Sequence, residues 1–208
     1  MQQPINAVLY YVADPMCSWC WGFSPVLAAV RESLPQSIAF QYVMGGLARD
    51  SDEPMPPDMR DYIRHHWHDV QQRTGAEFNW DFWSHCQPRR ATYPACRAVL
   101  AAACQEAGPA MFDAVQRAYY LEARNPSDVE TLIELSGELD LDRERFTADI
   151  ASADIEAQLQ ENFDTRRRLQ ANAFPSLVLE RDGMYYWIAR GYEEADAVLA
   201  RFDEHATT

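Results

Sequence analysis

A short apolar segment, AVLYYV at residues 7–12, places the first constraint on what this chain can fold into. The segment is too short for a typical helix and rich in β-branched and aromatic side chains, which is typical of a strand buried on both faces. A helix is predicted from about Cys17 to Leu34, and a second strand, IAFQYVM, follows from Ile38 to Met44. Residues 7–44 therefore read as strand, helix and strand, and a crossover of this length favours parallel pairing of the two strands.

The chain then changes to helix-period patterns with charged faces from residue 54 to about 171, broken repeatedly by proline and glycine. These breaks predict six or seven helices. Strand character returns after Phe174-Pro175, over residues 176–180 and 184–189, and an amphipathic helix is predicted over 193–205.

This order of elements is that of an α/β thioredoxin fold, βαβ followed by ββα, interrupted by a large all-helical insertion after the second strand. We expect a discontinuous thioredoxin-fold domain formed by residues 1–50 and 172–208. Residues 51–171 are expected to form the inserted helical domain.

Composition restricts the partners. The net charge is −14, and all 18 basic residues are arginine, so the chain repels phosphate backbones and anionic lipid. We therefore expect no nucleic acid and no membrane as partner. The N-terminal residues lack the basic region of a signal peptide, and we expect a cytoplasmic protein whose five cysteines are mostly reduced thiols.

Two cysteines fall at the expected start of the first helix, in the sequence Cys17-Ser18-Trp19-Cys20. A helix N-terminus stabilises a thiolate, the form of cysteine that attacks disulfides. Cys20 lies one turn further on the same side, near enough to close a disulfide onto Cys17. The spacing predicts Cys17 as nucleophile and Cys20 as resolving cysteine, although among five cysteines the spacing alone is a weak signal.

Phe174-Pro175 stands directly ahead of the third expected strand. In the thioredoxin context we predict a cis peptide bond there, turning the backbone of this loop toward the cysteine pair. Outside that context, a trans proline that begins a strand is the ordinary interpretation.

The order of elements and the motif Asp14-x-x-Cys17-x-Trp19-Cys20-x-Gly22 resemble the DsbA family, especially its cytosolic FrnE-type branch. The resemblance covers nearly the whole chain and implies a disulfide oxidoreductase or isomerase. Implied substrates are thiol- or disulfide-containing proteins, or glutathione as redox partner or co-substrate. No metal or organic cofactor is implied, and a homodimer is left open.

A sister group, the kappa-class glutathione transferases and hydroxychromene-carboxylate isomerases, resembles the same fold but has serine where Cys17 stands. Two cysteines therefore favour the redox branch, with a glutathione-dependent isomerase or transferase as the alternative. DsbA itself has proline and histidine where this chain has Ser18 and Trp19. Without that imidazole, we expect a less oxidising pair than in DsbA.

A non-catalytic binding or zinc module is a further alternative. Cys17 and Cys20 would need two more ligands, nominated from His65, His66, His68, His85 and Cys86. Buried or solvated histidines are the more ordinary interpretation. Cys86, Cys96 and Cys104 could form a second redox pair, but structural thiols are favoured.

Several neighbours of the motif are candidate site residues. Asp14 would either carry a proton for Cys20 or cap the helix entrance. Met16, Ser18, Trp19 and Phe174 are predicted to bind substrate, whereas Trp21 and Phe23 are either part of the same apolar rim or core contacts. The run Arg166-Arg167-Arg168 would hold a carboxylate of glutathione or an acidic peptide, or would be a solvated helix face.

Overall fold

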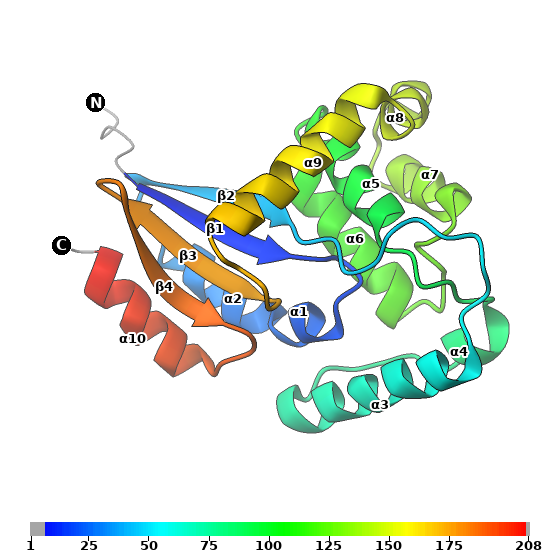
Figure 1. Ribbon diagram of the computed structural model, residues 1–208, viewed down its shortest axis with the longest axis horizontal. Coiled ribbons are helices and arrows are strands. Elements are labelled where there is room, and N and C mark those ends of the chain that lie inside the picture. The colour runs from blue at the N-terminus through cyan, green and yellow to red at the C-terminus, as the bar shows by residue number, and fades with distance from the viewer. Residues whose placement is uncertain (1–6, 207–208) are drawn as a thin grey trace.

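The computed structural model describes residues 7–206 and contains a four-stranded sheet in the order β2-β1-β3-β4 (Figure 1). The strands are β1 (Ala7–Ala13), β2 (Ile38–Met44), β3 (Ser176–Arg181) and β4 (Met184–Arg190). β1 pairs parallel to β2 and antiparallel to β3, and β3 pairs antiparallel to β4. The predicted α/β thioredoxin fold is confirmed.

The segment between β1 and β2 forms two helices, α1 (Ser18–Gly22) and α2 (Ser24–Glu32), with a break at Phe23. The single helix predicted from 17 to 34 is therefore wrong in this detail. Pro25 stands in the first turn of α2, where its missing N–H leaves the carbonyl one turn earlier without a helical donor. Because of this break, α1 is a short separate helix, with Cys17 directly before it and Cys20 within it.

Seven helices occupy the chain between β2 and β3, in agreement with the six or seven predicted. They are α3 (Pro57–Thr74), α4 (Phe82–His85), α5 (Tyr93–Ala103), α6 (Gly108–Tyr120), α7 (Val129–Glu138), α8 (Arg143–Ile150) and α9 (Ala153–Arg168). Figure 1 shows α5 to α8 gathered beyond β2, α9 running from them back against β2, and α3 lying apart beside α1. The division into two domains remains a prediction, since one buried apolar cluster extends from the sheet into these helices.

The two faces of the sheet are covered differently. Alternate residues of β1, Leu9 and Tyr11, point into the main core, where α2 and the C-terminal helix α10 (Ala195–Ala206) pack. Tyr10 and Val12 point the other way, into a smaller cluster that includes Leu169 just after α9. Over residues 7–206, no helix is both long and apolar enough to span a membrane.

Candidate active site

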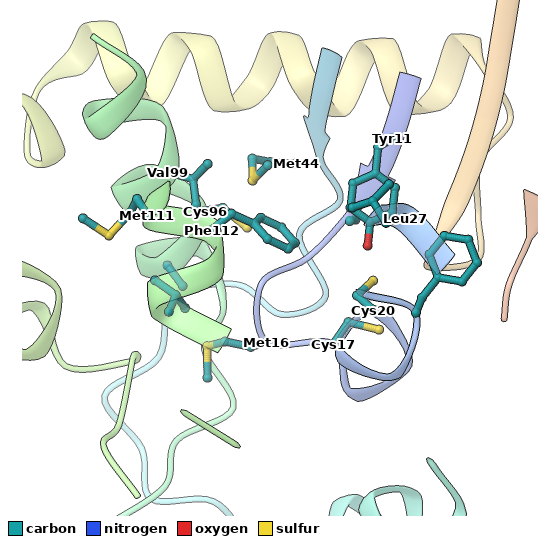
Figure 2. Packing of buried hydrophobic residues seen from close by; sticks show 14 of the residues in the cluster. Tyr11, Met16, Cys17, Cys20, Leu27, Met44, Cys96, Val99, Met111 and Phe112 are labelled. Atoms are coloured by element: carbon teal, nitrogen blue, oxygen red, sulfur yellow. The ribbon is translucent and has the colours of Figure 1, made fainter. Parts of the chain in front are cut away.

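The two cysteines lie at the end of β1 where the chain enters α1. Cys17 directly precedes the helix, and its N–H donates to the carbonyl of Asp14 at 3.0 Å. Cys17 keeps 7% of its surface exposed, whereas Cys20 is fully buried at 0%. Both are free thiols, and Figure 2 shows their sulfur atoms side by side. The structure thus brings the predicted pair together with one sulfur outward and one inward.

The loop before β3 faces this pair. The Phe174-Pro175 peptide bond is cis, as predicted. The thiol of Cys17 points at the carbonyl oxygen of Phe174 at 3.8 Å. The backbone of this loop thus faces the outward cysteine.

The ring of Phe174 packs closely against Gly45, in the loop after β2. A Cβ added to Gly45 would lie 2.5 Å from the Phe174 ring, so only glycine lets the ring approach this loop. Arg166 donates to the carbonyl of Gly45 at 2.8 Å, and its guanidinium lies 5.8 Å from the centre of the Phe174 ring. Arg166 therefore braces the loop, which neither sequence interpretation of the arginine run described; Arg167 pairs with Asp164 on the helix surface.

A cavity of about 260 Å³ opens beside Cys17. Its lining includes the four predicted substrate-binding residues, Met16, Ser18, Trp19 and Phe174. The remaining lining residues were missed by sequence reasoning as substrate contacts: Leu47, Tyr62, Ile63, His66, Trp67, Arg90 and Asn172. Four of these lie on α3, which reaches the dithiol only through tertiary packing against α1. A second hollow, of about 720 Å³, continues past Trp19 and Phe174 toward Tyr192.

Two of the newly found lining residues carry polar atoms without a hydrogen-bond or ion-pair partner in residues 7–206, although the charge of Arg90 acts on Asp14 and the His66 ring lies 4.4 Å from the Tyr62 ring. Arg90 is half-buried, and no carboxylate among the described residues comes within ion-pair distance of it. The Nδ1 atom of His66 is buried and has no hydrogen-bond partner within residues 7–206. In a chain of net charge −14, the guanidinium of Arg90 gives the cavity beside Cys17 a positive group that can attract an anion.

Asp14 lies behind the motif, outside the cavity, and is completely buried. Its carboxylate accepts hydrogen bonds from the N–H groups of Met16 and Leu47, at 2.8 and 2.7 Å, and from the Thr92 hydroxyl at 2.7 Å. The thiol of Cys96 points at the same carboxylate from 3.7 Å. Burial raises the pKa of Asp14 despite these donors. The carboxylate thus joins the turn before α1 to the loop after β2, and α1 itself has no side-chain cap.

The electrostatics of the inward cysteine oppose its ionisation. Burial raises the pKa of Cys20 well above its usual value, and the adjacent Cys17 and the charge of Asp14 raise it further. Cys20 is therefore held as a neutral thiol at neutral pH.

The remaining candidate residues lie elsewhere. Trp21 donates to the Glu77 carbonyl at 3.0 Å and stacks on Tyr120, and Phe23 is fully buried, so both are core contacts.

The thiol of Cys86 points at the Ala123 carbonyl, and Cys104 is exposed. Within residues 7–206, no group of three or more His, Cys, Asp or Glu side chains is placed to hold a metal ion.

A free Cys-x-x-Cys pair that opens a helix, opposite a cis-proline loop on this sheet, defines a dithiol protein of thioredoxin fold. Residues 10–184 match the family described as thioredoxin, and the chain belongs to that family. Its fold is that of the DsbA-like thiol–disulfide oxidoreductases, as the sequence resemblance implied.

Two solved structures are similar over nearly their whole length. A proposed protein disulfide isomerase from Nitrosomonas europaea is 30% identical with a TM-score of 0.85, the match covering 96% of this chain and 97% of that one. The cytosolic disulfide reductase DsbM from Pseudomonas aeruginosa is 30% identical with a TM-score of 0.77, covering 95% and 97%. DsbM has also been solved with GSH, at 28% identity, a TM-score of 0.76 and coverage of 97% and 100%.

A curated relative is more distant. The ClpXP adapter protein SpxH of Bacillus subtilis is 22% identical over 172 residues, which are 81% of this chain. The chain spans only 56% of the length of that relative and 59% of its Halalkalibacterium halodurans counterpart.

Proposed function

We propose that this protein is a cytoplasmic thiol–disulfide oxidoreductase in which Cys17 is the nucleophile and Cys20 resolves the mixed disulfide. The observation that carries the proposal is the unequal burial of the two sulfurs. Cys17 lines the cavity and faces the Phe174 carbonyl, whereas Cys20 is enclosed behind it. An incoming disulfide therefore meets Cys17 first.

The reaction proceeds by two thiol–disulfide exchanges. The Cys17 thiolate attacks one sulfur of a substrate disulfide, forms a mixed disulfide and releases the other sulfur as a thiol. Cys20 then attacks Cys17, so that a Cys17–Cys20 disulfide forms and the second substrate sulfur leaves as a thiol. Two electrons pass from the protein dithiol to the substrate, and two external thiols reverse the process.

The cavity supports glutathione as the external thiol or disulfide. Its walls combine an apolar side, with Met16, Trp19 and Phe174, and a polar side with Arg90 and His66. A peptide-like thiol with carboxylates would bury its cysteine among the first group and place an anion on Arg90. The related DsbM has been solved with GSH, which agrees with this assignment, and DsbM is described as cytosolic.

We assign Ser18 to substrate contact and the cis Pro175 to shaping the loop that a substrate meets. We assign the buried Asp14 to holding the turn before α1 against the loop after β2. The proposed chemistry runs on sulfur alone and needs no metal or organic cofactor.

The proposal is tested by trapping the intermediate. Reduced Cys20→Ser protein exposed to glutathione disulfide should accumulate one glutathione on Cys17, seen as a mass increase and mapped by peptide digestion. Wild type should pass on to a Cys17–Cys20 disulfide. Cys104→Ser, which removes an exposed thiol far from the motif in sequence, is the matched control and should behave as wild type.

Turnover assays on Cys20→Ser and Cys17→Ser separate the alternatives. A glutathione-dependent transferase or isomerase would keep its turnover in Cys20→Ser. An absence of any disulfide exchange, with Cys17→Ser equally active on a small electrophile, would reject the oxidoreductase assignment.

A further inference from the structure

A buried tyrosine lies against the dithiol and does not line the Cys17 cavity. Tyr11 is in β1, with its side chain in the main core and 0% exposed. Its ring is enclosed by other rings, with centroids 6.3 Å from Phe23, 6.1 Å from Phe112 and 5.5 Å from Tyr42. This packing fixes the ring and hence the direction of its hydroxyl group.

The hydroxyl group of Tyr11 points at the inward cysteine. Figure 2 shows the phenol oxygen directed toward the Cys20 sulfur. Within residues 7–206 this hydroxyl makes no hydrogen bond of normal geometry, although buried polar groups usually have a partner. Burial, followed by the charge that Cys20 can carry, raises the pKa of Tyr11 well above its usual value. The phenol therefore keeps its proton at neutral pH and remains a donor.

We propose that Tyr11 is a positioning residue for the resolving step, in which its hydroxyl donates a hydrogen bond to the Cys20 sulfur as that sulfur becomes anionic. This inference rests on the proposed function and adds a residue to it. The need for a donor comes from the surroundings of Cys20, where burial and the Asp14 carboxylate both oppose negative charge.

The step balances without consuming Tyr11. In the mixed disulfide, Cys17 is bonded to a substrate sulfur and Cys20 is a thiol. As Cys20 loses its proton and attacks, the Cys17–Cys20 bond forms and the bond from Cys17 to the substrate sulfur breaks. The leaving sulfur takes the electron pair and a proton, so one S–H bond replaces another. Tyr11 keeps its own proton throughout.

Other titratable groups face the same space. Tyr42 comes from β2, Tyr120 from the end of α6, and Asp14 and Cys17 from the turn into α1. Tyr42 provides the matched control, because its hydroxyl is also buried without a partner in the described chain, but its charged neighbours are Asp113 and Arg31 rather than the cysteines.

The test is a rapid-quench measurement of single turnovers with glutathione disulfide from pH 6 to pH 9. Acid-quenched samples of wild type, Tyr11→Phe and Tyr42→Phe are followed by mass spectrometry for the rise and decay of the Cys17 mixed disulfide. Tyr11→Phe should form it at the wild-type rate and resolve it about ten-fold more slowly, with its pH profile displaced about one unit upward. Tyr42→Phe should match wild type in both phases.

Three outcomes would overturn the inference. Tyr11→Phe could resolve with the wild-type rate and pH profile, or Tyr42→Phe could slow resolution equally, which would indicate packing. A wild-type mixed disulfide that persists would remove the proposed function and this inference together. If Tyr11→Phe does not fold, 3-fluorotyrosine at position 11, a stronger donor of nearly the same shape, should accelerate resolution, and an unchanged rate would count against the role.

Discussion

The Cys17 sulfur lies 3.8 Å from the carbonyl oxygen of Phe174, a residue 157 positions further along the chain. The contact joins the turn between β1 and α1, in the βαβ part of the fold, to the loop before β3, in the ββα part. It also places the reactive sulfur against the backbone of the cis-proline loop, so a change that moves Phe174 should affect the chemistry at Cys17.

Gly45 offers a direct test of that dependence. In Gly45→Ala, the new methyl group would lie 2.5 Å from the Phe174 ring, which must move. We expect a loss of about 1–3 kcal/mol in the free energy of unfolding and slower reduction of glutathione disulfide. Gly137→Ala is the control, because a Cβ there meets nothing within 4 Å and helix propensity favours alanine. Urea unfolding and turnover assays should separate the two variants; equal behaviour would contradict the role given to Gly45.

Arg90 should determine the preference for anionic substrates. Arg90→Met keeps the aliphatic stem and removes the charge, so we expect about a ten-fold higher KM for glutathione disulfide. Turnover of hydroxyethyl disulfide, which has no carboxylate, should be unchanged. Arg143→Met makes the same charge change at an exposed position of α8 and should have no effect on either substrate. An equal loss on both disulfides in Arg90→Met would show that Arg90 acts through structure instead.

Asp14 should be important for stability, with a defined dependence on pH. Asp14→Ala leaves the Thr92 hydroxyl and the Leu47 N–H without their acceptor, and we expect a loss of about 2–4 kcal/mol. Because burial raises the pKa of Asp14 in the folded state, the folded protein binds this proton more tightly than the unfolded chain. The advantage of wild type over Asp14→Ala should be largest below the usual carboxyl pKa and should shrink as pH rises through the raised one. Urea unfolding from about pH 4 to about pH 7 measures this; an advantage that grows with pH would contradict it.

The pH dependence of resolution follows from Cys20. Since burial raises the pKa of its thiol, the thiolate fraction is small at neutral pH and the resolving rate should rise about ten-fold per pH unit. We expect no plateau below the usual pKa of a cysteine thiol. Rapid-quench data on wild type provide the profile, and a rate that is already constant at neutral pH would show that Cys20 ionises more easily than its burial implies.

Local patterns were sufficient for much of this structure. The strands, the six or seven helices between β2 and β3, and Met16, Ser18 and Trp19 beside Cys17 were predicted, because each has a signal within a few residues of itself. The cis Phe174-Pro175 bond was predicted only from the thioredoxin context, not from its neighbours in sequence. Arg90 and His66 could not be assigned to substrate, since α3 and the segment before α5 reach Cys17 only through the packing of distant helices. Because β1 is apolar on both faces, its sequence does not indicate which face Tyr11 occupies, and nothing local indicates that its hydroxyl points toward Cys20. The break at Phe23 has a local cause in Pro25, which stands in the first turn of α2.

The most direct test of the central claim is equilibration of the reduced protein in glutathione buffers of graded potential, with the Cys17–Cys20 disulfide quantified by mass spectrometry. The account predicts one reversible two-electron transition, confined to this pair, at a potential more negative than the value of about −120 mV of DsbA. A protein whose Cys17 and Cys20 never form a disulfide, or form one that glutathione does not reduce at any ratio, would contradict it.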